Sequence, residues 1–209
     1  MTGTVLVADD HPLFRQALRL AVEKILPEAA IAEAGTLAAA VAAATAAPDL
    51  RLILLDLKMP GATGYSGIAL LHAECPDVPI LVVSSAEGAA AADEARAFGA
   101  IGFLHKGSDL GAIEAAVAAA IGRRPAPRSP APDSATEEIR ETVASLTPTQ
   151  LKVLLAVLDG QLNKQIAHNL GISEATVKAH MTAIMRKLDV RNRTQAALVA
   201  RSLGLDLAH

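Results

Sequence analysis

The sequence predicts a doubly wound α/β fold with a five-stranded parallel sheet, followed by a small all-α domain of four helices. Three observations support this prediction. Short apolar runs alternate with helical stretches five times between residues 4 and 121. A stretch rich in Pro, Ser and Arg then occupies residues 123–134, and four helical stretches separated by turn residues come after it. We therefore expect domains at 1–122 and 146–209, joined by a linker at 123–145.

The first domain is expected to consist of repeated β–α units. The predicted strands are residues 4–8, 30–34, 51–55, 80–83 and 101–104. The predicted helices are residues 12–26, 36–46, 66–74, 87–97 and 108–121. Alternating units of this kind build a parallel sheet with helices on both faces. Strands covered on both faces should be continuously apolar, as TVLVA and ILVV are.

The second domain has clear helix start and stop signals. Thr147 and Gln150 form a capping box around Pro148 at the first helical position, and that helix is expected to end at Asp159 and Gly160. A short helix follows at 163–169. Gly171 then supplies a sharp turn, Ser173 caps a helix at 174–188, and a last helix spans 194–203. Short helical character is also expected at 135–145.

Charge is divided unequally along the chain. Residues 1–122 carry 7 Lys and Arg against 14 Asp and Glu, whereas residues 146–209 carry 8 against 4. An acidic first part and a basic last part indicate different partners, and the basic part is a candidate for nucleic-acid binding. Cys75 is the only cysteine, and no apolar run is long enough to span a bilayer. We expect a cytoplasmic protein without membrane association.

Polar residues follow four of the five predicted strands. Asp9 and Asp10 follow the first, Asp56 the third, Ser84 and Ser85 the fourth, and Lys106 the fifth. The carboxyl ends of parallel strands meet at one edge of the sheet, where such folds bind ligands. Three crowded carboxylates require a cation, and all-oxygen ligands at an open site suit Mg²⁺. A lysine and a hydroxyl opposite them suit a phosphoryl group carried by an aspartate.

Taken singly, these residues have simpler interpretations. Asp9 and Asp10 could merely favour the start of the helix at Pro12. Asp56 could be a solvated strand end and Lys106 a solvated charge, while Phe103 could be ordinary core. Only their joint placement at the strand ends points to a site.

The segments VLVADDH, LLDLKMPG, VVSS and GAIGFLHK resemble the receiver domain of bacterial response regulators, over residues 3–121. The resemblance implies a flavodoxin-like fold with Asp56 as the phosphoacceptor. It also implies roles for further residues: Mg²⁺ ligation by Asp10, Asp9, Asp56 and the backbone carbonyl of Lys58, phosphoryl contact by Lys106, and switch movements of Ser84 and Phe103. Gly107 departs from the family, which usually has proline in a cis bond there, so no cis bond is expected. The loop after Pro60 looks about two residues longer than usual.

The basic domain has the order of a helix-turn-helix. An apolar stripe at residues 177, 181, 184 and 188 is expected to face the core. The opposite, alanine-rich face is slim enough to enter a major groove, and Lys164 and Thr176 near helix N-termini are placed for phosphate contact. The predicted DNA contacts are Lys164, Thr176, Lys178, Ala179, Thr182 and Arg186. The alternative is a solvated, alanine-rich helix in a small bundle.

Residues 146–200 resemble the LuxR-type DNA-binding domain. With a receiver before it, the chain is similar to the NarL/FixJ class of response regulators. The class implies a partner histidine kinase, promoter DNA and a homodimer joined through the last helix. Two rival functions stay open: an Mg²⁺-dependent phosphohydrolase with an aspartyl nucleophile, and a regulator that binds DNA constitutively. The first usually needs a second acid two residues after the nucleophile, where this chain has His11 and Lys58. The intact acid cluster argues against the second.

Overall fold

The computed structural model of this 209-residue chain describes residues 3–62, 64–85, 89–123, 142–143, 145–202 and 205. The chain divides into two compact units, residues 1–129 and 130–209. The two predicted domains fall one in each unit, while the predicted bounds of the linker and the short helix at 135–145 lie mostly outside the described residues. Among the described residues, no helix is both long and apolar enough to cross a membrane.

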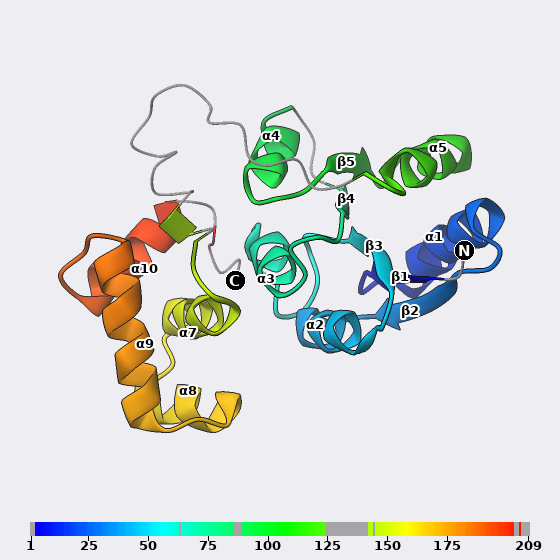
Figure 1. Ribbon diagram of the computed structural model, residues 1–209. Helices are drawn as coiled ribbons and strands as arrows, with labels where there is room; N and C mark the ends of the chain where they lie inside the picture. The colour runs from blue at the N-terminus through cyan, green and yellow to red at the C-terminus, as the bar shows by residue number, and fades with distance from the viewer. Residues whose placement is uncertain are drawn as a thin grey trace. The chain divides into compact units, whose positions relative to one another are not determined.

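The first unit contains a five-stranded parallel sheet in the order β2-β1-β3-β4-β5, as Figure 1 shows. The strands are β1 (Thr4–Ala8), β2 (Ala30–Ala34), β3 (Leu50–Leu55), β4 (Ile80–Ser84) and β5 (Gly102–His105). All neighbouring pairs are parallel. This order reverses direction between β1 and β3, and ligands bind beyond the carboxyl ends of the strands at such a point.

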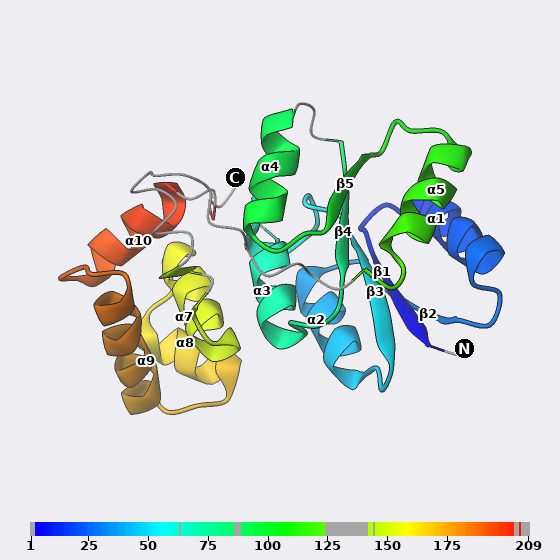
Figure 2. The same ribbon diagram turned by 45° about the horizontal axis from the view of Figure 1, so that its top comes forward.

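Helices cover both faces of the sheet. They are α1 (Pro12–Ile25), α2 (Leu37–Ala46), α3 (Ser66–Glu74), α4 (Ala89–Ala97) and α5 (Leu110–Ala120). Figure 2 shows α1 and α5 on one side of the sheet and α2, α3 and α4 on the other. Alternate strand residues therefore enter different cores. One core, between the sheet and α1 and α5, includes Val5, Val7, Leu52, Leu54 and Val83. Burial on both faces explains the continuously apolar strands.

The second unit is helical in its described part: α7 (Pro148–Leu158), α8 (Asn163–Leu170), α9 (Glu174–Lys187) and α10 (Arg193–Ser202). The predicted capping box at Thr147 and Gln150 is present. Gly171 has a φ of 65°, a left-handed conformation that glycine adopts without strain, and it ends α8 sharply. The predicted stripe on α9 is buried, with Val177 and Ile184 both fully inaccessible.

The predicted elements agree with the structure in type, and their ends coincide with the observed ends or differ from them by one or two residues. The predicted start at 87 and the predicted end at 203 lie outside the described residues. The fifth strand begins at Gly102 rather than 101, although Ile101 already donates its N–H to the carbonyl of Ile80. The last helix of the receiver-like unit begins at Leu110 rather than 108, because the side chain of Asp109 accepts a hydrogen bond from the N–H of Ala112 and caps it.

Candidate phosphoacceptor site and DNA-reading surface

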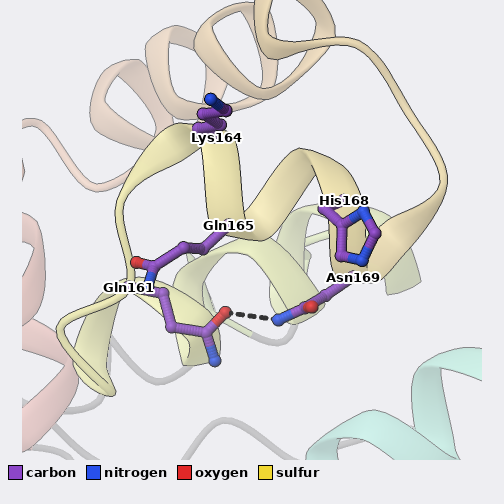
Figure 3. Close-up of a pocket in the computed structure, with 5 residues that line it drawn as sticks. All are labelled: Gln161, Lys164, Gln165, His168 and Asn169. Atoms are coloured by element: carbon purple, nitrogen blue, oxygen red, sulfur yellow. Dashed lines mark hydrogen bonds between the residues drawn. The ribbon is translucent and has the colours of Figure 1, made fainter.

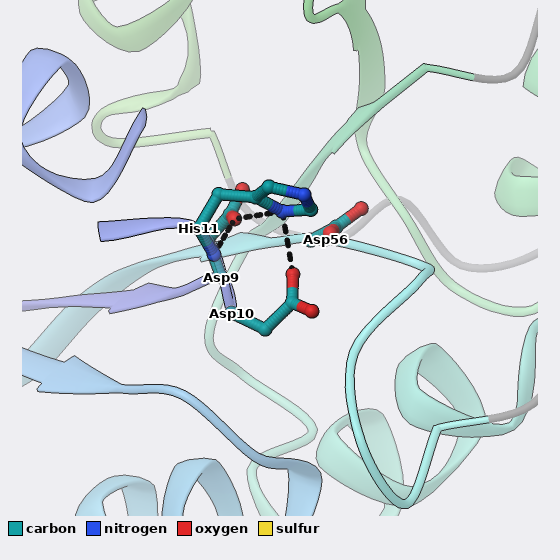
Figure 4. A group of neighbouring side chains, drawn as sticks. All are labelled: Asp9, Asp10, His11 and Asp56. Atoms are coloured by element: carbon teal, nitrogen blue, oxygen red, sulfur yellow. Dashed lines mark hydrogen bonds and ion pairs between the residues drawn. The ribbon is translucent and has the colours of Figure 1, made fainter. Parts of the chain in front are cut away.

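The acids that follow β1 and β3 converge at the carboxyl edge of the sheet. Oxygen atoms of Asp9, Asp10 and Asp56 and a ring nitrogen of His11 all lie within 4.8 Å of one another. Figure 4 shows these four side chains gathered together. The hydrogen bonds between strands continue into these residues. Asp56 donates its N–H to the carbonyl of Ala8 (2.8 Å), and Asp9 donates its N–H to the carbonyl of Ala34 (3.0 Å). Asp9 is fully buried and Asp56 is 2% exposed. The sheet itself therefore fixes two of the three carboxylates.

Lys106, after β5, places its ammonium between the two buried acids. Its Nζ lies 2.6 Å from Oδ2 of Asp9 and 2.8 Å from Oδ2 of Asp56. Burial alone would lower the pKa of Lys106, but hydrogen bonding to Asp56 and contact with Asp9 outweigh it and raise the pKa above its usual value. Lys106 is therefore charged at neutral pH and compensates the acids.

A cavity of about 390 Å³ opens beside Asp56 and Lys106. Its remaining walls are His11, Leu13, Phe14, Lys58 and Ser85. The backbone N–H of Lys58 donates to Oδ1 of Asp56 (3.1 Å), which fixes the carboxylate from the side opposite Lys106. Gly61, with a φ of 84°, lets the chain turn away after Pro60 and keeps the edge open. The arrangement leaves room for a phosphoryl-sized group next to Asp56.

The two predicted switch residues lie on neighbouring strands. Ser84 ends β4 and is fully buried, and its carbonyl accepts the N–H of Lys106 (2.9 Å). Phe103 lies in β5, pairs with Val82 and is partly exposed. Side chains alternate along a strand, so Ser84 and Phe103 share the sheet face opposite Val83 and Leu104. No peptide bond among the described residues is cis, and Gly107 donates its N–H to Nδ1 of His105 (3.0 Å).

Sequence reasoning did not identify three residues, two in α1 and one just before it, that contact the site. Nδ1 of His11 lies 2.6 Å from Oδ1 of Asp10. The ring of Phe14 lies 5.0 Å from the Lys106 ammonium, a cation–π distance. Arg15 donates to the carbonyl of Asp9 (2.7 Å). The available sequence signal was that His11 directly follows the two acids and that Phe14 and Arg15 lie about one turn further along the chain.

The donor set fits Mg²⁺. Oδ2 of Asp9 and Oδ1 of Asp10 are buried and accept no well-aligned hydrogen bond among the described residues, although Lys106 and His11 each lie 2.6 Å away. The Lys106 ammonium compensates charge, and both carboxylates keep lone pairs for a further ligand. Mg²⁺ takes oxygen ligands from one or two carboxylates and keeps several waters, which matches a carboxylate cluster beside an open cavity.

The described part of the second unit presents an exposed polar face on α9. Lys178, Ala179, Thr182 and Arg186 are exposed, on the side opposite the buried stripe, and Thr176 is half-buried. The hydroxyls of Thr176 and Thr182 already have partners within the unit. The first lies 2.8 Å from that of Ser173, and the second donates to the carbonyl of Lys178 (3.0 Å). Thr182 therefore offers a methyl group and an oxygen lone pair, rather than its hydrogen.

A cavity of about 500 Å³ lies along α8, lined by Gln161, Lys164, Gln165, His168 and Asn169 (Figure 3). Asn169 donates to the side chain of Gln161 (2.9 Å). Arg193, at the start of α10, donates to the carbonyl of Gln161 and to Oδ1 of Asn163 (3.0 Å). These bonds fix the N-terminus of α8 and with it the exposed Lys164. Sequence reasoning did not identify Arg193.

Comparison with known proteins agrees with both halves of this description. The family described as "Response regulator receiver domain" matches residues 5–118, and the family described as "Bacterial regulatory proteins, luxR family" matches residues 144–200. The "Glycerol metabolism activator" of Pseudomonas putida is 39% identical over 207 residues, covering 94% of each chain. The "Nitrate/nitrite response regulator protein NarP" of Escherichia coli strain K12 is 33% identical, covering 93% of each.

A solved structure of the RcsB response regulator of Salmonella typhimurium covers 97% of this chain and 98% of its own, with a TM-score of 0.51. At 20% identity this likeness shows the fold alone. The two family matches and the full-length relatives show more. The chain belongs to the two-component response regulators of the NarL/FixJ class, which join a receiver domain to a LuxR-type DNA-binding domain and act as transcription regulators.

Proposed function

We propose that a histidine kinase phosphorylates Asp56 and that this modification controls promoter binding by the second domain. The observation that carries the proposal is the bridging of two buried carboxylates by Lys106, next to a cavity that reaches Asp56. Burying a cluster of charges costs stability, and such clusters are concentrated at functional sites. The surroundings of Asp56 support its role as nucleophile, because Lys58 and Lys106 each hold one of its oxygens.

The proposed transfer is a displacement at phosphorus. An oxygen of Asp56 forms a bond to phosphorus while the phosphorus–nitrogen bond of the kinase's phosphohistidine breaks. The electron pair stays on the imidazole nitrogen, which then takes a proton from water. Mg²⁺, held by Asp10, Asp9, Asp56 and the carbonyl of Lys58, would neutralise charge on the phosphoryl oxygens.

The response to phosphorylation is proposed to start at Lys106. A phosphoryl group on Asp56 carries more negative charge than the carboxylate did, so it attracts the ammonium away from Asp9. The Ser84 hydroxyl turns toward the same oxygens, and Phe103 moves into the space that Ser84 leaves. This change would bias a two-state receiver and release or dimerise the DNA-binding domain.

For the second domain we propose that α9 enters the major groove of double-stranded promoter DNA, in a cytoplasmic homodimer joined through α10. The basic charge of residues 146–209 and the exposed face of α9 support DNA contact. Leu198 on α10 is 58% exposed, which supports a protein partner for that helix. The proposed DNA contacts are Lys164, Thr176, Lys178, Ala179, Thr182 and Arg186.

The assignment of Asp56 is tested by intact mass. The wild type, incubated with acetyl phosphate and Mg²⁺, is expected to gain the mass of one phosphoryl group. Asp56→Asn keeps the size of the side chain but loses its nucleophilic charge, so it should gain nothing. A phosphorylated Asp56→Asn protein would move the site elsewhere, and multiple turnover of a small phosphate ester would favour a phosphohydrolase.

A further inference from the structure

Arg15 forms a hydrogen bond to the backbone of Asp9, one of the acids that we propose as Mg²⁺ ligands. Its guanidinium donates a hydrogen bond to the carbonyl of Asp9 (2.7 Å) and a second, longer one to Glu33 at the end of β2 (3.4 Å). The side chain of Arg15 is only 20% exposed. A planar guanidinium can serve two acceptors at once in a fixed geometry, so α1 and β2 are tied together through the end of β1.

The carbonyl of Asp9 belongs to the peptide that joins Asp9 to Asp10. Fixing that carbonyl fixes the plane of the peptide and with it the positions of the N and Cα atoms of Asp10, from which its side chain starts. The Asp9 side of this peptide is already fixed. Asp9 donates to Ala34, and its carboxylate accepts from His11 (2.8 Å). The side chain of Asp10 is 32% exposed, and among the described residues its recorded contact is with His11. The N–H of His11 restrains the peptide that follows Asp10, and the Arg15 bond restrains the peptide that precedes it.

Arg19 provides an internal comparison. It lies one turn along the same helix and also approaches Glu33 (3.5 Å), but its main bond is to Glu23 on the surface (2.8 Å). Its side chain is 51% exposed. The two arginines carry the same charge and share one acceptor, and the structure records a bond to the Asp9 backbone only for Arg15.

We infer that Arg15 is a positioning residue for the Mg²⁺ site, acting through the Asp9–Asp10 peptide. The inference rests on the proposed function, because it assumes that Asp10 is a ligand. It makes a prediction with a definite sign. If Arg15 acted only through its positive charge, its removal would strengthen Mg²⁺ binding, since like charges repel. If Arg15 positions Asp10, its removal weakens binding, because the ligand must be ordered when the ion binds.

The test is a titration of the full chain with Mg²⁺ alone, followed by the backbone NMR shifts of residues 9, 10 and 56. Arg15→Ala should raise the dissociation constant by about tenfold, the lower end of the loss expected for a group that orients a metal ligand. Arg15→Lys keeps the charge but cannot serve both acceptors, so it should lie between Arg15→Ala and the wild type. Arg19→Ala should bind as the wild type does.

Thermal unfolding in EDTA separates positioning from stability. If Arg15→Ala unfolds at the titration temperature, Arg15→Lys carries the test. Equal or tighter Mg²⁺ binding by the folded Arg15 variant would overturn the inference, and so would an equal loss in Arg19→Ala. A wild type that binds no Mg²⁺ at these acids would instead contradict the proposed function, and the inference with it.

Discussion

The two domains hold their functional charges in opposite ways. In the receiver, Asp9 and Asp56 are 0% and 2% exposed, and Lys106 lies between them with 15% of its side chain exposed. On α9 of the DNA-binding domain, Lys178 and Arg186 are exposed, while the stripe beneath them is apolar and buried. A buried charge contributes directly to the free energy of unfolding of its own domain. An exposed charge lies above a core whose stability does not depend on it, and it remains available to contact a partner.

This difference predicts different results for one substitution, lysine to alanine, in the two domains. Removing one member of a buried ion pair leaves the other charge uncompensated and costs several kcal/mol. Removing an exposed charge usually changes stability by about 0.5 kcal/mol or less. The same exposed charge can contribute strongly to DNA binding, because it can pair with phosphates and release counterions or hydrogen-bond to a base edge.

The largest expected effect is the loss of stability in Lys106→Ala. Two buried carboxylates would then lack their cation, and the receiver should lose about 3 kcal/mol, the lower end for a buried pair because Lys106 is partly exposed. Urea unfolding without Mg²⁺, followed by tyrosine fluorescence, measures this. Tyr65 is the only tyrosine and the chain has no tryptophan, so the signal reports on the receiver.

One matched variant and the addition of Mg²⁺ sharpen that measurement. Lys58→Ala removes an exposed lysine from the rim of the same cavity and keeps the backbone N–H that contacts Asp56, so the receiver should keep its stability. Mg²⁺ should restore part of the stability lost in Lys106→Ala by supplying the missing positive charge. A Lys106→Ala receiver as stable as the wild type would show that the acids do not need this lysine.

A smaller effect is expected in the DNA-binding domain, and it concerns binding rather than stability. If Lys178 reads a guanine edge, Lys178→Ala should cost about 1–3 kcal/mol on a specific duplex and much less on random DNA. Thr182 should act more weakly, through its methyl group, because its hydroxyl hydrogen is already donated to Lys178. Titrations on both duplexes at several salt concentrations measure the affinity lost in each variant and how that loss depends on salt.

Lys164→Ala is the comparison for Lys178. Lys164 lies at the start of α8, and we expect it to contact phosphate rather than bases. Its removal should weaken binding to all duplexes about equally and reduce the salt slope by roughly one unit. Equal losses on specific and random DNA for Lys178→Ala would make that residue a phosphate contact as well.

Much of the fold could be predicted because its signals are local. Apolar runs mark strands that are buried on both faces. Asp9 and Asp56 directly follow such runs and Lys106 comes two residues after one, so the rule for parallel sheets brings them to one edge. The stripe on α9 follows from helical periodicity, and the cap at Thr147 from a four-residue motif. None of these predictions requires a contact between distant side chains.

The contacts that depend on tertiary packing could not be predicted. The sequence contains the acids but does not say that Lys106 lies nearly equidistant from Asp9 and Asp56, or that Phe14 faces its ammonium. The Arg15 bond to Asp9 depends on how α1 packs against the sheet. The Thr182 hydroxyl could have been free to contact a DNA base or bonded to a carbonyl of its own helix. Which of these occurs depends on local geometry, which the sequence does not give.

The central claim is that chemistry at the buried acid of one domain changes DNA binding by the exposed face of the other. The direct measurement is the affinity of the full chain for a duplex selected from a random library with the acetyl-phosphate-treated wild type. Treatment with acetyl phosphate and Mg²⁺ should raise the affinity of the wild type by about tenfold, within the usual range of coupling between sites. Asp56→Asn should bind equally with and without treatment. Equal affinity of the treated and untreated wild type, with phosphorylation confirmed by mass, would contradict the account.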